Sequence, residues 1–184
     1  LKSINQFYNK RKAELQSILG PEKAKSHRID RLTDTRNRRV NHYLHTASRR
    51  IANLLAKEQI GLLVIGKNSG WKQEIGIGKR NNQNFVSIPH ARFIEMLTYK
   101  CRMVGINVVV TEESHTSKCS FLDMESIGHH DRYQGKRIKR GMFRSATGKV
   151  INADLNGAYN IIRKVAPSAF VNGVEDVAVH PVAL

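Results

Sequence analysis

The sequence is short of cysteine, proline and tryptophan, with two, four and one of these among 184 residues. Cys101 and Cys119 are too few for a disulfide framework, which excludes a disulfide-stapled secreted domain and fits a reducing cytoplasm. No apolar run is long enough to span a bilayer, and no signal-peptide pattern opens the chain, so we expect no membrane partner. The sequence begins with Leu1 rather than Met, which indicates a fragment, or a chain that was trimmed or renumbered.

Acidic residues are also scarce, because 15 Asp and Glu stand against 31 Lys and Arg, for a net charge of +16. A surface with this charge repels itself unless it meets a polyanion, so nucleic acid is the expected partner. A solvated helix face is the alternative explanation for the arginines of the second helix. The residues that we expect to contact nucleic acid are Arg36, Arg39, Arg49, Lys72, Lys136, Arg137, Lys139 and Arg140.

Apolar residues at three- and four-residue intervals predict helices over residues 2–19, 28–59 and 89–104. Two short apolar runs, 62–65 and 106–111, predict neighbouring strands that are covered on both faces. Alternating helices and strands indicate an α/β sheet with flanking helices, in one domain or one domain with a small insertion. In such sheets the functional residues collect at the carboxyl ends of the strands.

Three further segments lack a regular pattern. Residues 67–84 predict a loop, in which Trp71 either stacks on a base or, as we favour, plugs a surface groove. Residues 114–150 predict an irregular insertion with a basic hairpin near 137–143. Residues 167–184 predict a loosely held tail after the last helix.

Two carboxylates are the candidate chemical groups. Glu113 ends the second predicted strand, and Asp154 opens the last predicted helix, whose apolar stripe is Ala158, Ile161, Ile162 and Val165. Paired acids on a basic protein suggest Mg²⁺ or Mn²⁺ bound between acid side chains and phosphate oxygens. Two such metals would activate a water and stabilise the leaving oxygen of a phosphodiester. The alternative is a solvated Glu113 and a helix-capping Asp154, and spacing alone leaves both interpretations open.

Five segments resemble the TnpB family of transposon-encoded proteins, long called OrfB-type transposases and similar to type V CRISPR nucleases. The resemblance covers residues 1–174, and the motifs occur in the family's order. It implies an RNase H-like, RuvC-type nuclease domain guided by an RNA transcribed from the end of the element. The segments are VIGKN at 64–68, WKQE at 71–74, NNQNF at 81–85, ESHTSK at 113–118 and NADLNGAYNI at 152–161.

The resemblance also implies three catalytic acids. The last acid matches Asp154. The middle acid usually ends the strand that finishes here in Gly66, but one branch of the family carries a substitute before its Ser-x-Thr-Ser segment. Glu113 matches that substitute, and Glu112 is the neighbouring candidate. The first acid belongs upstream of Lys2 and is absent from this sequence, so it was trimmed away or the chain is a truncated, inactive relative.

The family resemblance further implies a zinc ribbon built from two Cys-x-x-Cys pairs, placed between the middle and last acids. Here only Cys119 remains of those cysteines. His129 and His130 together with Cys119 fall one ligand short of a tetrahedral site and have the wrong spacing. We therefore expect an irregular zinc-ribbon-like insertion that binds no zinc.

These resemblances predict three parts of an α/β, RNase H-like (RuvC-type) protein. Residues 1–113 are the first part of the nuclease domain, 114–150 the degenerate insertion, and 151–184 the last helix and tail. The expected function is that of the carboxyl-terminal part of an RNA-guided DNA endonuclease. Its expected partners are a guide RNA from the element and a target DNA, with Mg²⁺ or Mn²⁺ at Glu113 and Asp154. The alternatives are an inactive RNA-guided repressor on the same scaffold and, more remotely, an unrelated RNA-binding protein such as a ribosomal one.

Overall fold

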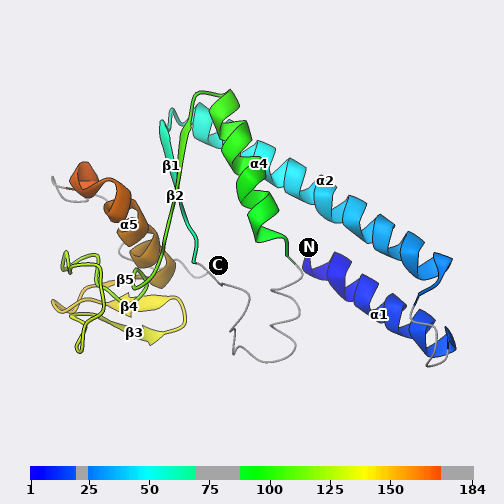
Figure 1. Cartoon of the computed structure of the whole chain (residues 1–184). Helices are drawn as coiled ribbons and strands as arrows, with labels where there is room; N and C mark the ends of the chain where they lie inside the picture. The colour runs from blue at the N-terminus through cyan, green and yellow to red at the C-terminus, as the bar shows by residue number, and fades with distance from the viewer. Residues whose placement is uncertain (20–24, 69–87, 171–184) are drawn as a thin grey trace. The chain divides into compact units, whose positions relative to one another are not determined.

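The computed structural model describes residues 1–19, 25–68 and 88–170 of the chain (Figure 1). It divides into two compact units, the first comprising Leu1–Gly61 and Lys72–Asn107 and the second Leu62–Trp71 and Val108–Leu184. The predictions for Trp71, for Lys72, for most of the loop at 67–84 and for the end of the tail lie outside the described residues. None of the described helices is both long and apolar enough to cross a membrane.

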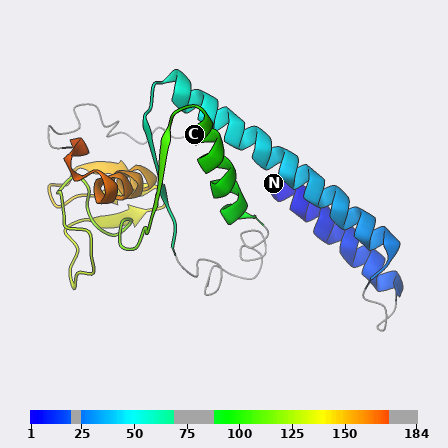
Figure 2. The same ribbon diagram turned by 45° about the horizontal axis from the view of Figure 1, so that its top comes forward.

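The first unit consists of three helices, α1 (Lys2–Leu19), α2 (His27–Lys57) and α4 (His90–Met103). The Ser26 hydroxyl caps α2 by accepting a hydrogen bond from the Ile29 amide at 3.4 Å. The helices α1 and α2 lie side by side in both views (Figures 1 and 2). The three helices that the sequence predicted in this unit are confirmed. The core of the unit is formed by Val40, Leu44 and Met96, with Leu1, Ile4 and Phe93 packed against it.

The buried face of α2 is not purely apolar. Tyr43 and Leu54, which belong to the apolar periodicity of this helix, are 49% and 57% exposed. Ser48 is fully buried instead, and it accepts a hydrogen bond from the buried Lys100 ammonium at 2.8 Å. Lys100 also donates to the His45 carbonyl at 2.7 Å, and burial lowers the pKa of this lysine. Polar contacts thus join α2 and α4 in addition to the apolar core.

The strands β1 (Leu62–Gly66) and β2 (Asn107–Thr111) are neighbours in a two-stranded sheet, as predicted, and all of their residues except Asn107 belong to the second unit. Asn107 N–H donates to the Gly61 carbonyl at 2.9 Å, and Lys67 N–H donates to the Thr111 carbonyl at 2.8 Å. The first bond joins the start of β2 to the start of β1, and the second joins the ends of the two strands, so the strands run parallel. The prediction of burial on both faces was wrong, since Leu62 is 40% and Val110 46% exposed. Elements of the described residues therefore cover the faces of this two-stranded sheet only in part.

The insertion carries an antiparallel sheet of β3 (Lys136–Lys139), β4 (Met142–Arg144) and β5 (Val150–Asn152). The predicted basic hairpin is therefore present as β3 and β4, with a bulge between Arg137 and Lys139. Gly141, at φ +77°, makes the turn between the two strands. Phe143, Ile151 and Ala153 form a small core, against which Leu122 and Tyr159 pack.

The helix α5 (Ala153–Val165) follows β5 directly and is packed against this sheet (Figure 1). A short 3-10 turn, η1 (Pro167–Phe170), comes next. The Phe170 ring lies 5.0 Å from the Phe121 ring and 5.5 Å from the Tyr159 ring, centroid to centroid. The predicted loose tail is therefore wrong for residues 167–170, because aromatic packing fixes them on α5.

The most buried face of α5 is polar rather than the apolar stripe that was predicted. Asn156 Oδ1 accepts from the Phe121 amide, and its Nδ2 donates to the Cys119 carbonyl, both at 2.9 Å. Asn160 Nδ2 donates to the carbonyls of Thr116 and Cys119 at 2.9 and 2.8 Å. An irregular segment leaves backbone groups without ladder partners, and buried ones must find side chains. The side-chain amides of Asn156 and Asn160 are the partners of these backbone groups in the insertion.

Candidate active site

Glu113 and Asp154, far apart in the sequence, line one hollow of about 360 Å³ in the second unit. Glu113 reaches it from the chain just after β2, and Asp154 from the first turn of α5. Asn68, His115 and Arg137 are among the other residues of this lining. We call this space the acid hollow. The structure thus brings together the two carboxylates that the sequence singled out.

Asp154 does not cap α5. The cap is Asn152, whose side-chain oxygen accepts from the Asp154 amide at 2.8 Å and from the Leu155 amide at 3.3 Å. The interpretation of Asp154 as a helix cap is therefore wrong. The physical reason is that Asn152 lies one position before the helix, where a side-chain oxygen reaches the free amides. The exposed Asp154 carboxylate is left to face the acid hollow.

Glu113 occupies the space beside Gly66, the last residue of β1. A Cβ atom built on Gly66 would lie 2.6 Å from Glu113 Oε2 and 2.9 Å from Glu113 Cβ. It would also lie 2.8 Å from Ile161 Cδ1 of α5. Distances this short do not occur between such atoms, so this space admits the Glu113 side chain only because residue 66 has none. Glu112 is exposed and does not line the acid hollow.

The Glu113 backbone and side chain both contact Asn68, which follows β1. Glu113 N–H donates to Asn68 Oδ1 at 3.2 Å, and Asn68 Nδ2 donates to Glu113 Oε1 at 3.4 Å. Asn68 was not singled out from the sequence as a site residue. Its position, two residues after a strand that ends at the same sheet edge as Glu113, is the signal that would have found it.

Basic residues of the β3–β4 hairpin adjoin the acid hollow. Arg137 lines it and also lines a neighbouring hollow of about 360 Å³ with Lys118, Tyr133 and Lys136. Arg137 forms no ion pair with another described residue, so its guanidinium is available to phosphate oxygens. Lys139 and Arg140 are exposed on the same hairpin.

The predicted nucleic-acid residues of the first unit differ in their surroundings. Arg36 donates to Asn5 Oδ1 at 2.9 Å and lies 5.8 Å from the Tyr8 ring centroid, so it joins α2 to α1. Arg39 is exposed and lines a hollow of about 520 Å³. Arg49 is exposed on α2, and Lys72 lies outside the described residues.

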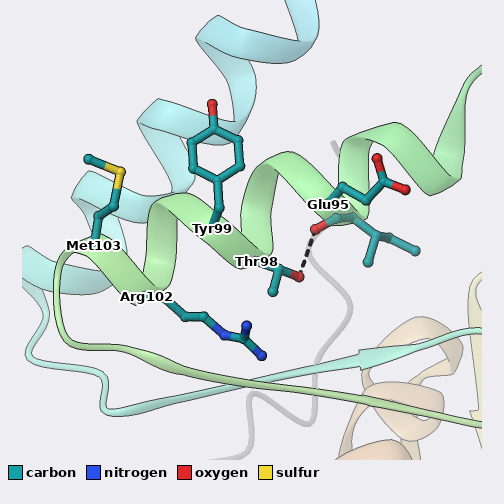
Figure 3. Close-up of a pocket in the computed structure, with 6 residues that line it drawn as sticks. Glu95, Thr98, Tyr99, Arg102 and Met103 are labelled. Atoms are coloured by element: carbon teal, nitrogen blue, oxygen red, sulfur yellow. Dashed lines mark hydrogen bonds between the residues drawn. The ribbon is translucent and has the colours of Figure 1, made fainter.

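A larger hollow, of about 550 Å³, lies on α4 and carries different chemistry. Its walls are mainly apolar, and the Thr98 hydroxyl turns back to donate to the Ile94 carbonyl at 2.8 Å (Figure 3). Glu95 is its single carboxylate, so it lacks the paired acids of the acid hollow. Its lining residues are Ile94, Glu95, Thr98, Tyr99, Arg102 and Met103.

Two family models match the chain, one over each half. Residues 1–72 match the OrfB-type family described as "Probable transposase", and residues 90–161 match the "Cas12f1-like, TNB domain". The chain belongs to the TnpB family. Its fold, mixed α/β with helices and small sheets, is similar to that in the cryo-EM structure of a Cas12f1–sgRNA–target DNA complex, with a TM-score of 0.56 at 20% identity. That match covers 84% of this TnpB-family chain and 40% of the other protein. No curated protein matches the chain.

The acid hollow of this TnpB-family chain is lined by two carboxylates and by His115. Among residues 1–19, 25–68 and 88–170, no group of three or more His, Cys, Asp or Glu side chains is placed to hold a metal ion. Carboxylate oxygens are hard donors of the type that Mg²⁺ and Mn²⁺ prefer. The donor chemistry of Glu113 and Asp154 therefore suits such a metal, although the described residues form only part of a coordination shell.

Proposed function

We propose that this chain is the carboxyl-terminal, RuvC-like part of a transposon-associated, RNA-guided DNA endonuclease. The observation that carries the proposal is the convergence of Glu113 and Asp154 on one hollow, with Arg137 in its wall. Opposite charges in one wall suit a phosphodiester, because the guanidinium binds phosphate oxygens while the acids hold a divalent cation. The relative Cas12f1 was solved with an sgRNA and a target DNA, which supports RNA and DNA as partners here.

We also propose how the fold corresponds to an RNase H-like domain. The parallel pair β1 and β2 would belong to the RNase H-like sheet, on which α5 packs beside β1. Residues 1–113 and 151–184 would form the nuclease domain. Residues 114–150 would be the degenerate zinc-ribbon-like insertion, which here carries a small antiparallel sheet.

Glu113 and Asp154 are the residues that would hold Mg²⁺ or Mn²⁺. When bound, such a metal supplies Lewis-acid stabilisation of the phosphate and lowers the pKa of a bound water. Other residues of the chain would orient the acids and bind the phosphate. Asn68 orients the Glu113 carboxylate, and Arg137 draws the phosphate group to the hollow. The family resemblance involves three acids, so the proposal requires a further carboxylate from another part of the full protein.

The second candidate function is an RNA-guided DNA-binding protein that does not cut. The observation that favours it is that no three His, Cys, Asp or Glu side chains of the described residues are grouped to hold a metal ion, even though His115 lines the acid hollow. The two candidates make opposite predictions for cleavage and the same prediction for guided binding.

The test is cleavage of a target plasmid by the full-length protein with its element-derived guide RNA and Mg²⁺. We expect Asp154→Ala and Glu113→Ala each to abolish cutting while guided DNA binding persists, since each removes one oxygen ligand set. Glu112→Ala is the matched control, because its side chain is outside the hollow, and it should cut normally. Guided binding without cutting by the unaltered protein would establish the repressor instead. Normal cutting by Glu113→Ala would refute the assigned site.

A further inference from the structure

We propose that Lys164 and Asn68 are positioning residues, which fix the Glu113 carboxylate relative to Asp154. The consequence for cleavage rests on the proposed function, whereas the positioning itself rests on contacts in the structure. The loop that carries Glu113 begins where β2 ends, at Thr111. Beyond that point no ladder bonds restrain the backbone, so side chains have to fix its path.

Lys164, on the last turn of α5, brackets Glu113 from both sides. Its ammonium donates to the Glu112 carbonyl at 2.9 Å and to the Ser114 carbonyl at 3.1 Å. An ammonium has three donors, and two of the three are used in these bonds. Bonds from a charged donor are roughly twice as strong as neutral ones. The two carbonyls on either side of Glu113 are therefore tied to one point on α5.

A second set of contacts acts on Glu113 itself. Thr116 folds the loop back by donating to the Glu113 carbonyl from its hydroxyl at 2.8 Å and from its amide at 3.2 Å. Asn160 Nδ2 in turn donates to the Thr116 carbonyl at 2.9 Å. Asn68 adds its two contacts, at 3.2 and 3.4 Å. The Asn68 bonds are long, so we expect Lys164 to contribute more than Asn68.

The helix α5 thereby sets the positions of both acids. Asp154 belongs to the first turn of this helix, and Asn160 and Lys164, one turn apart, hold the loop with Glu113. A rigid helix between the contact points keeps the distance between the carboxylates constant. These contacts distinguish Lys164 from an exposed lysine of the insertion such as Lys149.

The experiment compares Lys164→Met, Lys164→Arg, Asn68→Leu and the exposed control Lys149→Met in the full chain. Hydrogen exchange measures how fast the amides of residues 112–118 exchange, and calorimetry measures the affinity of the chain for Mn²⁺. We expect Lys164→Met to speed exchange in 112–118 and leave β3, β4 and β5 unchanged. Its Mn²⁺ affinity should fall about tenfold or more, as for other residues that orient metal ligands. Asn68→Leu should do the same more weakly, Lys164→Arg should retain most of the affinity, and Lys149→Met should change neither measurement.

Three other results would each contradict part of the proposal. Unchanged exchange in 112–118 with Lys164→Met would overturn the positioning role. Faster exchange throughout the second unit, with a general loss of stability, would overturn it too, because the lysine would then be only a structural residue. If the unaltered chain binds no Mn²⁺, the proposed metal site fails, and the exchange data alone decide whether Lys164 positions Glu113.

Discussion

Gly66 and Glu113 share one space at the end of the parallel strands, and only one of the two positions carries a side chain there. A Cβ on Gly66 would approach Glu113 Oε2 to 2.6 Å. The family resemblance implies a middle acid at the position of Gly66, and in this chain Glu113 reaches the same space from the loop that follows β2. The absence of a side chain at Gly66 and the placement of the Glu113 side chain therefore depend on each other.

The first prediction is that Gly66→Ala disables the site with only a moderate loss of stability. The new methyl group would collide with Glu113 and Ile161, and overpacking of this kind costs about 1–3 kcal/mol. Glu113 is the more easily displaced, so we expect Mn²⁺ affinity and any cleavage to fall while the chain stays folded. Calorimetry and thermal unfolding measure the two effects.

The control for that variant is Gly61→Ala, since a Cβ on Gly61 meets nothing within 4 Å. It should leave Mn²⁺ affinity unchanged. The double variant Gly66→Glu, Glu113→Ala places the carboxylate at the end of β1. It should recover part of the Mn²⁺ affinity that Glu113→Ala loses. If Gly66→Ala binds Mn²⁺ like the unaltered chain, the shared space has no functional meaning.

The sequence predicted the elements well because their signals are local. The apolar spacing of α2 and the glycines around β1 act over a few residues, and both elements formed where expected. Convergence of Glu113 and Asp154 also followed from sequence, through the rule that functional groups gather at the carboxyl ends of strands. The family resemblance strengthened this inference.

What the sequence did not predict depends on contacts between distant residues. The polar face of α5 was missed because Asn156 and Asn160 look like exposed residues until the irregular insertion is placed against them. Their spacing of four residues was a usable signal for a shared helix face. The role of Lys164 has no signal in the sequence, because its partners are backbone carbonyls.

The second prediction separates the cap of α5 from its functional acid. Asn152→Ala removes an oxygen that accepts from two amides, so it should cost about 1 kcal/mol of stability. Asp154→Ala removes only a charge near the helix N-terminus, a contribution that salt screens. In urea denaturation at about 0.5 M salt, where the Debye length is short, we expect a clear loss for Asn152→Ala and a much smaller one for Asp154→Ala. Equal losses would return the capping role to Asp154.

The third prediction concerns pH and Lys100. Burial lowers the pKa of Lys100 in the folded state below its ordinary value of 10.5, with the charge of Arg49 acting in the same direction. Between the folded pKa and 10.5 the unfolded chain binds more protons, so this group makes stability rise with pH in that window. Lys100→Met lacks the effect. The stability of the unaltered chain minus that of the variant should therefore increase as pH rises towards 10.5. A difference that is flat or falls with pH would contradict the assignment.

The fourth prediction distinguishes two kinds of basic residue in binding to DNA. Lys139 is exposed on the hairpin, whereas Arg36 joins α2 to α1 through Asn5. If Lys139 neutralises one phosphate of a single-stranded oligonucleotide, Lys139→Ala should lower the slope of log affinity against log salt by about 0.7. Arg36→Ala should mainly lower the thermal stability. Fluorescence anisotropy at several salt concentrations measures the slopes, and the opposite pattern would show that the two roles were exchanged.

The last prediction is that hydrogen bonds to a buried carboxylate, rather than zinc, fix the insertion. Glu125 is buried, and its two oxygens accept from the Ser120 amide at 2.6 Å and the Gln134 amide at 2.9 Å. Arg163 of α5 donates to the Glu125 carbonyl, so the same residue also ties the insertion to the helix. Glu125→Ala would leave the buried Ser120 N–H without its acceptor, at about 1–3 kcal/mol, and would also remove the acceptor of the partly buried Gln134 N–H. We therefore expect a large fall in thermal stability for Glu125→Ala and a negligible one for the exposed control Glu112→Ala. In buffer free of Mg²⁺ and Mn²⁺, treatment with EDTA should leave the unaltered chain as stable as before, and metal analysis should find far less than one zinc per chain. A chelator-sensitive unfolding temperature, or zinc in equal proportion to protein, would show that a metal and not Glu125 organises this segment.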